Sequence, residues 1–254
     1  VCGTGGDNLQ TFNISTTASF VIAGAGGSVA KHGNRSVSGI SGSADIFEYF
    51  GFDLNSEPWI VEEMIEKIGI GFMFAPKFHP AMKNVAPIRR ELGVKTFFNM
   101  LGPMVNPSFP KNQMVGVFNL ELQRLYGYLY QQTDKNYSIV HALDGYDEIS
   151  LTGPTKIISN KSENILHPED LGIDKIKQSE ISGGHTIKNA ATIFMNVISG
   201  NGTHAQNNVI CANAGLAIAT AKQMDHQHGF ELAKESLLSG KAKTVLMNLI
   251  ELSK

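Results

Sequence analysis

Short runs of β-branched residues alternate along this chain with longer stretches in which apolar residues recur at helical spacing. Continuous apolar runs of this length, bounded by turn-forming residues, are typical of buried strands. Four such runs are SVAKHG at 28–33, GFMFAP at 71–76, QMVGVF at 113–118 and YSIVHALDG at 137–145, the last being the clearest. The pattern therefore predicts a sheet whose strands are separated by helices.

Helices are predicted in the stretches between these strands. The small apolar residues of 17–27 predict a buried helix with Ser15 or Thr16 near its N-cap. A second helix is expected from about Ser43, and a third over EPWIVEEMIEKIG at 57–69, where apolar residues recur every four positions.

The C-terminal part of the chain has a different texture. Residues 152–182 are polar and rich in turn-forming residues, which predicts an excursion within the domain. About the last seventy residues carry helical patterns throughout. The order of elements predicts an α/β fold with a mixed or parallel central sheet flanked by helices.

Composition narrows the classes of function. The chain has 254 residues, 42% of them hydrophobic, which is enough for one large domain or two small ones. A net charge of −2 gives no reason to expect nucleic acid or an anionic membrane as the main partner, so any anion site must be local. Cys2 and Cys211 are expected to be free thiols in a reducing, cytoplasmic compartment. No leader is evident, but a chain that begins in mid-loop says little on that point.

The first candidate for chemistry is the glycine loop GTGGD, in which Gly3, Gly5 and Gly6 precede Asp7. Glycine leaves room for a ligand to approach the main chain, whose N–H groups can then form a concave anion site. A bare glycine loop is also a common tight turn. Two well-known nucleotide motifs are missing from the sequence, because GAGGSV at 24–29 lacks the third glycine of a dinucleotide fingerprint and neither GxxxxGKS nor GxxxxGKT occurs.

Two polar segments strengthen the anion-site interpretation. In TFNIST, Asn13, Ser15 and Thr16 stand directly before an apolar helix, where side-chain oxygens meet the unpaired N–H groups of the first turn. In AKHGNRSVSGISGSAD, at 30–45, Lys, Arg and four serines lie between glycines and lead to a predicted N-cap at Ser43. Cationic side chains, hydroxyls and helix N-termini are the groups that bind a polyphosphate. A helix cap with more polar residues than it needs, or a solvated surface loop, would carry similar residues.

Two further segments carry charged groups. Asp147 and Glu148 are adjacent in DGYDEIS, after the clearest strand, and could share a Mg²⁺ ion that also binds phosphate oxygens. Acidic turn residues after a strand are the plainer alternative. His79, Arg89 and Arg90 lie on or beside a predicted helix. An arginine pointing to a cleft would suit a carboxylate ligand, whereas twin arginines on a helix usually lie on a solvated face.

Taken together, these segments resemble those of the anthranilate phosphoribosyltransferases, the second-step enzymes of tryptophan synthesis. GTGGD, TFNIST, KHGNRSVS with SGSAD, HPAMKNVAPIRRELGVKTFFNMLGP and DGYDEIS occur in the family's order, and the likeness runs through the whole chain. The resemblance implies a nucleoside phosphorylase/phosphoribosyltransferase-like α/β domain over residues 1–254. It also implies a small helical domain, built in the family mostly from residues preceding GTGGD, which is expected to be largely missing from this chain.

The resemblance implies a set of contacts to phosphoribosyl pyrophosphate. By position these are Gly3, Gly6, Asp7, Thr11, Asn13, Ile14, Ser15, Thr16, Lys31, His32, Gly33, Asn34, Arg35, Ser36, Val37, Ser38, Gly39 and Ser43. Two residues depart from the family's commonest pattern: Asn8 stands where a glycine usually follows GTGGD, and Gly39 replaces a serine. The first change is expected to stiffen the loop, and the second leaves only a backbone contact.

The other implied contacts concern the second substrate and the metal. Anthranilate would lie near Gly3 and Asn34, with Arg89 facing its carboxylate. The cofactor Mg²⁺ would be held by Ser15, Asp147 and Glu148. The family likeness further implies a homodimer of the full-length protein, a cytoplasmic location, and neither nucleic acid nor membrane as a partner.

The implied reaction transfers the 5-phosphoribosyl group of phosphoribosyl pyrophosphate to the amine of anthranilate, giving N-(5-phosphoribosyl)anthranilate and pyrophosphate. Positioning and charge stabilisation should carry it, without a covalent nucleophile or an obligatory general base. One alternative is a pyrimidine nucleoside phosphorylase-like enzyme, which should carry a serine at the position of Gly33. Another is a non-catalytic homologue that binds nucleic acid, which the near-neutral charge argues against.

Overall fold

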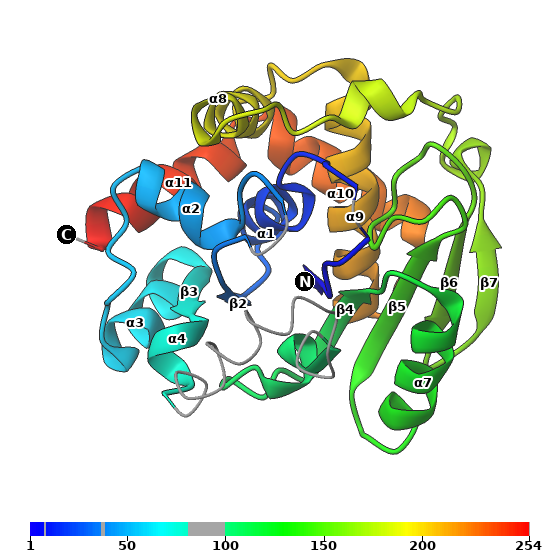
Figure 1. Ribbon diagram of the computed structural model, residues 1–254, viewed down its shortest axis with the longest axis horizontal. Coiled ribbons are helices and arrows are strands. Elements are labelled where there is room, and N and C mark those ends of the chain that lie inside the picture. The colour runs from blue at the N-terminus through cyan, green and yellow to red at the C-terminus, as the bar shows by residue number, and fades with distance from the viewer. Residues whose placement is uncertain (8, 37–38, 81–99, 254) are drawn as a thin grey trace, which may run out of the picture.

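A computed structural model describes residues 1–7, 9–36, 39–80 and 100–253. Within these ranges a five-stranded sheet has the order β1-β4-β5-β6-β7 (Figure 1). Its parallel part consists of β1 (Cys2–Gly3), β4 (Asn112–Gly116) and β5 (Asn136–Ala142), and its antiparallel part adds β6 (Thr155–Ser159) and β7 (Glu163–Leu166). A separate parallel pair is formed by β2 (Val29–Gly33) and β3 (Ile70–Phe74). The predicted mixed sheet is confirmed.

Strand β5 is buried on both faces because alternate residues enter two different cores. Ile139 packs with Tyr126 of α7 (Leu120–Tyr130) on one face. Val140 joins the larger core, to which α9 (His204–Lys222) contributes, on the other. The two helices therefore cover opposite faces of the sheet (Figure 1), which explains why this strand reads as a continuous apolar run.

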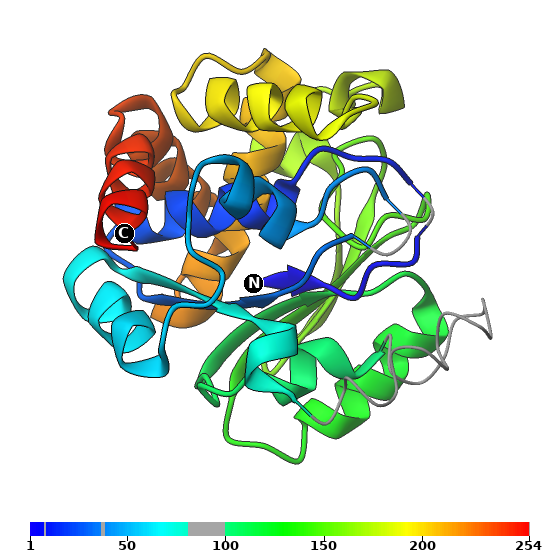
Figure 2. The same cartoon turned by 60° about the vertical axis from the view of Figure 1, so that its left-hand side comes forward.

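Helix α1 (Ile14–Gly24) lies at the centre of the helical layer (Figure 2). It is surrounded by the C-terminal helices α8 (Ile187–Ile198), α9, α10 (His226–Leu238) and α11 (Lys241–Leu252). Its Thr17 and Ser19 are fully buried, and their hydroxyls donate to backbone carbonyls four residues earlier. Because these two hydroxyls find acceptors within the helix itself, their burial leaves no hydrogen-bonding group unpaired.

Shorter elements complete the described chain. They are the helices α2 (Ser43–Tyr49), α3 (Pro58–Ile68) and α4 (Ala75–Phe78), and the 3-10 turns η1 (Gly102–Val105), η2 (Pro168–Leu171) and η3 (Gln178–Ile181). No helix in the described ranges is both long enough and apolar enough to cross a membrane.

The N-cap of each of the first two helices differs from the sequence prediction. The N-cap of α1 is Asn13, not Ser15 or Thr16, so both of those residues lie in its first turn. The N-cap of α2 is Gly42, not Ser43, because the Asp45 carboxylate accepts the Gly42 N–H at 2.7 Å.

Residues 152–182, predicted as a polar, turn-rich excursion within the domain, include two strands that the sequence analysis did not predict. They contain β6, which pairs with β5 so that Ile157 lies opposite Val140, and the edge strand β7. Strand β7 has four residues, of which the first three are exposed. A short, exposed edge strand buries too few side chains to leave a period in the sequence.

Candidate active site

Two segments far apart in the sequence meet at the carboxyl end of the parallel strands. The glycine loop follows β1, and the acidic pair Asp147 and Glu148 follows β5, so both lie at the same edge of the sheet. The Gly5 N–H donates to Asp147 Oδ2 at 2.7 Å. The glycine loop and the acidic pair singled out in the sequence are therefore parts of one site.

Glycine is required where this loop bends and where other strands touch Asp147. Gly5 and Gly6 have φ angles of +67° and +82°, in the left-handed region that disfavours side chains. A methyl group at Gly3 would overlap the carboxylate of Asp147, and one at Gly116 would overlap its carbonyl oxygen. Sequence reasoning missed Gly116, although a glycine at the end of a buried strand is a signal of close backbone approach.

Lys31 brings a buried cation to the same place. It is 3% exposed, and its ammonium group lies 3.5 Å from the Ser15 hydroxyl in the first turn of α1. Burial lowers the pKa of Lys31, and the neighbouring Glu148 carboxylate opposes that shift. Ser15, Lys31 and Glu148, which come from three separate motifs, thus share one environment.

The acidic pair carries more negative charge than its surroundings neutralise. Burial, together with the charge of Asp7, raises the pKa of Asp147 to about 7. Burial and the charge of Asp147 raise the pKa of Glu148 well above its ordinary value, against the effect of Lys31. A bound divalent cation would favour the ionised carboxylates, so these residues fit Mg²⁺.

The number of carboxylates is also appropriate for that ion. Over the ranges that the structure describes, no three His, Cys, Asp or Glu side chains come together as a metal-binding group. Mg²⁺ in phosphate-binding sites usually takes only one or two protein carboxylates and completes its shell with phosphate oxygens and water.

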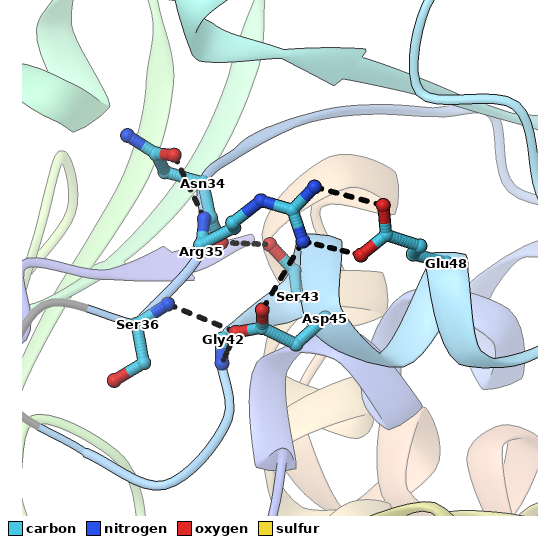
Figure 3. A network of polar contacts seen from close by, with 7 residues as sticks. All are labelled: Asn34, Arg35, Ser36, Gly42, Ser43, Asp45 and Glu48. Atoms are coloured by element: carbon cyan, nitrogen blue, oxygen red, sulfur yellow. Dashed lines mark hydrogen bonds and ion pairs between the residues drawn. The ribbon is translucent and has the colours of Figure 1, made fainter. Parts of the chain in front are cut away.

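The loop that follows β2 is closed by Asp45. Its Oδ2 atom accepts the N–H of Ser36 at 3.0 Å and the N–H of Gly42 at 2.7 Å (Figure 3). One carboxylate in the first turn of α2 therefore binds the backbone on both sides of the loop. Within the loop, the Ser43 hydroxyl donates to the carbonyl oxygen of Asn34 at 3.4 Å.

Arg35 is paired with carboxylates of α2. Its guanidinium donates to both oxygens of Glu48, in one case at 2.8 Å, and lies 3.5 Å from Asp45 (Figure 3). Arg35 and Glu48 are both about half exposed, and ion pairs at such sites contribute little to stability. A phosphate contact of Arg35 stays a prediction, with Glu48 as the competing anion.

Asn13 joins the start of α1 to this loop. Its Nδ2 donates to the Ser41 carbonyl at 3.1 Å, and the Ser41 hydroxyl donates to Asn13 Oδ1 at 2.9 Å. Although Asn13 stands at the N-cap, its side chain makes no capping hydrogen bond to α1. The TFNIST segment and the loop after β2 are thus held together by a side-chain bridge.

The remaining predicted residues occupy different positions. Ile14 and Thr16 are each only 2% exposed, and contacts of these two residues with a ligand stay predictions. The Thr11 backbone forms an isolated bridge with Ser182, and the Gly39 N–H donates to the Ser36 hydroxyl at 2.7 Å. The predicted contacts at Val37, Ser38 and Arg89 lie outside the described residues.

His32 and His79 form a pair beside this site. Their ring centroids are 4.9 Å apart and their planes are nearly perpendicular, at 74°. The Nε2 atom of each ring is buried without a hydrogen-bond partner among the described residues. Burial, and secondarily the neighbouring His79, lowers the pKa of His32 to about 4. His32 is therefore neutral near pH 7.

Acidification should destabilise the protein through His32. The folded residue takes up its proton only near pH 4, whereas its ordinary pKa is 6.5, so the unfolded state binds more protons between these values. The free energy of unfolding should fall between pH 6.5 and 4, by at most about 3 kcal/mol from this group. Urea unfolding of the wild type and His32→Gln over this range would measure the effect, and equal pH slopes for the two proteins would contradict it.

Comparison with known proteins assigns the chain to a family. Residues 1–243 match the family described as "Glycosyl transferase family, a/b domain". The anthranilate phosphoribosyltransferase of Flavobacterium psychrophilum is 63% identical over 253 residues, which cover 100% of this chain and 77% of that protein. This chain belongs to the anthranilate phosphoribosyltransferases. The Bacteroides fragilis strain YCH46 member is 46% identical over 254 residues and is likewise covered to 77%.

Solved structures of the family share this fold. The anthranilate phosphoribosyltransferase of Thermus thermophilus superposes with a TM-score of 0.94 at 36% identity, covering 99% of this chain and 76% of that one. The Saccharomyces cerevisiae enzyme, solved in complex with PRPP and Mg, gives 0.91 at 29% identity, covering 99% and 72%. The predicted phosphoribosyltransferase-like α/β class is confirmed.

Proposed function

We propose that this chain catalyses transfer of the 5-phosphoribosyl group from phosphoribosyl pyrophosphate to the amine of anthranilate. The products are N-(5-phosphoribosyl)anthranilate and pyrophosphate, in the second step of tryptophan synthesis from chorismate. The observation that carries the proposal is the hydrogen bond from Gly5 to Asp147, which joins a glycine loop for phosphate to a carboxylate for metal. Membership of the family supports the same reaction.

Mg²⁺ is proposed to be held by Ser15, Asp147 and Glu148. Two observations support this assignment: the acidic pair is buried with raised pKa values, and the Ser15 hydroxyl lies 3.5 Å from the Lys31 ammonium, whose pKa burial lowers and the charge of Glu148 raises. When bound, the ion supplies positive charge next to the pyrophosphate oxygens. The Saccharomyces cerevisiae relative was solved with PRPP and Mg.

The chain's own groups would stabilise the leaving pyrophosphate. Breaking the C1–O bond of the ribose places negative charge on that anion. The glycine loop, the first turn of α1 and the Lys31 ammonium come together at one edge of the sheet, where the positive end of the α1 dipole and the ammonium would attract that anion. They act by position and charge, so neither a covalent nucleophile nor an obligatory general base is required of the protein.

Anthranilate is proposed to lie near Gly3 and Asn34, with Arg89 binding its carboxylate in bidentate geometry. An aryl amine is already a nucleophile, so the protein needs mainly to hold it against C1 of the ribose. We also propose that the full-length protein is a cytoplasmic homodimer, as the family resemblance implies. Light scattering of the full-length protein and fractionation of its host cells would test these two points.

The alternative functions have less support. A nucleoside phosphorylase-like enzyme should carry a serine in place of Gly33, and a side chain there would overlap the Ser43 hydroxyl and the Phe72 ring. The net charge of −2 disfavours a nucleic-acid-binding homologue. Fluorescence-monitored consumption of anthranilate with phosphoribosyl pyrophosphate and Mg²⁺ tests the proposal. Phosphorolysis of thymidine without anthranilate turnover would overturn it.

Asp45→Ala should weaken the binding of phosphoribosyl pyrophosphate. Without the carboxylate, Ser36 and Gly42 lose their common acceptor and the loop after β2 loses its shape. We expect KM for phosphoribosyl pyrophosphate to rise about tenfold, the loss of one charge-assisted anchor. Glu62→Gln, on α3, is the control because it removes an exposed carboxylate from a helix that does not carry Asp45, and its KM should change less than about twofold. Equal effects of the two variants would show that Asp45 has no special part.

A further inference from the structure

Asn213 lies in the middle of α9 and binds the backbone directly after the acidic pair. Its Oδ1 accepts the Ile149 N–H at 3.0 Å, and its Nδ2 donates to the Ile149 carbonyl at 2.9 Å. The same Nδ2 donates to the Val209 carbonyl, one turn earlier in α9, at 2.8 Å. Asn213 is completely buried, so water does not compete for these bonds.

The two bonds to Ile149 fix the orientation of its backbone. A carboxamide donates and accepts in one plane, so it can bind both the N–H and the C=O of a single residue, as a neighbouring strand would. The third bond, to Val209, fixes the carboxamide itself on the helix. Glu148 precedes Ile149 directly, so the clamp holds the backbone that immediately follows the acidic pair.

The loop that carries the acidic pair does not hold its shape by local preference alone. Leu151 has a φ angle of +58°, a conformation disfavoured for a residue with a branched side chain, and it is nevertheless buried. Backbone held in a strained region persists only where surrounding contacts over-determine it. Two such contacts hold this loop. The Thr152 hydroxyl donates to the Asp144 carboxylate, and Asn213 binds the backbone of Ile149.

We propose that Asn213 is a positioning residue for metal binding, which holds Asp147 and Glu148 in the direction that Mg²⁺ with phosphoribosyl pyrophosphate requires. This inference rests on the proposed function of the acidic pair. Asn213 touches neither substrate nor metal, and it acts only through the backbone of Ile149.

The experiment compares Asn213→Leu with Thr220→Val. Leucine is an apolar residue of broadly similar shape to asparagine but makes none of the three hydrogen bonds. Thr220 is also buried on α9, and its hydroxyl bonds to the Ser138 hydroxyl at 2.7 Å, near the opposite end of β5. Thr220→Val therefore removes a comparable buried polar contact without touching the acidic loop.

The readout is Mn²⁺ binding, measured by electron paramagnetic resonance with phosphoribosyl pyrophosphate present and anthranilate omitted. Asn213→Leu should weaken Mn²⁺ binding about tenfold, the usual effect of removing a group that orients metal ligands. Thr220→Val should bind Mn²⁺ as the wild type does. Hydrogen exchange of the Ile149 amide should accelerate only in the Asn213 variant, because only there does it lose its acceptor.

Two results would overturn the inference. One is wild-type Mn²⁺ binding by Asn213→Leu, and the other is equal weakening by Thr220→Val, which would indicate general loosening. If Asn213→Leu does not fold, Asn213→Ser is the second variant, since its hydroxyl cannot bind both groups of Ile149 and the same weakening is expected. Failure of the wild type itself to bind Mn²⁺ with phosphoribosyl pyrophosphate would refute the proposed metal site, and this inference with it.

Discussion

Asp147→Asn combined with Glu148→Gln should lower kcat by about a hundredfold or more and remove its dependence on Mg²⁺, because charge stabilisation of the leaving group is the largest catalytic contribution expected here. The amide oxygen introduced at position 147 could still accept the Gly5 N–H, so the loop should keep its shape. Steady-state kinetics over a Mg²⁺ titration would measure the effect. Glu163→Gln, on the exposed edge strand β7, is the control for loss of a carboxylate and should behave as the wild type.

The same double variant should be more stable than the wild type when no metal is present. The pKa of Asp147 is raised to about 7 from an ordinary value of 3.8, so the folded state binds more protons between these values. The contribution of Asp147 to the free energy of unfolding of the wild type therefore falls as pH rises from about 4 to about 7. The variant lacks this carboxyl group, so its free energy of unfolding should not fall for this reason over the same range. Reduced activity together with unchanged or lower stability at pH 7 would contradict the assignment of an uncompensated acidic pair.

Gly116→Ala should impair both folding and metal binding. The added methyl group would overlap the carbonyl oxygen of Asp147, which is backbone and cannot rotate away. Either β4 or the acidic loop must move, and overpacking of this kind costs about 1–3 kcal/mol or more. Because the displaced atom belongs to Asp147, a proposed metal ligand, Mg²⁺-dependent kcat should fall even under conditions where the variant is fully folded.

Gly127→Ala is the matched control for Gly116→Ala. Gly127 lies within α7, and a methyl group there would meet the Ile158 side chain at 3.6 Å, an ordinary contact. Replacing a helical glycine by alanine should raise the free energy of unfolding by about 0.5–1 kcal/mol. Thermal unfolding and Mg²⁺-dependent kinetics of both variants would test the pair. Wild-type kinetics for Gly116→Ala would show that the close approach of Gly116 to the Asp147 backbone is not needed for activity.

Local sequence patterns were sufficient for much of the fold. The strands β2, β3, β4 and β5 were predicted within a few residues, because each is a short apolar run bounded by turn-forming residues. Strand β7 was missed, since its first three residues are exposed and its four positions carry no recognisable period. Helix α2 begins at Ser43, as predicted, but its N-cap is Gly42, whose N–H donates to the Asp45 carboxylate.

The candidate site was predicted in its parts but not in its connections. The glycine loop was predicted from the sequence because glycine adopts the positive φ angles found at Gly5 and Gly6 more readily than other residues. The metal site was predicted because adjacent carboxylates after a strand suggest a hard cation. The pairing of Arg35 with Glu48 was not predicted, because it depends on which face of a short helix turns toward the loop. Neither was the bridge from Asn13 to Ser41, which joins residues that belong to different motifs.

The sequence by itself determined the element order, the chemical character of each loop and the family resemblance, because these depend on residue type and short spacing. The tertiary structure decided which groups share an environment. Gly5 and Asp147 are 142 positions apart, and Asn213 lies 64 positions beyond Ile149, yet each pair is hydrogen-bonded. Such contacts arise from strand order and helix packing, which no local pattern encodes, and they alone turn a glycine turn and an acidic turn into one site.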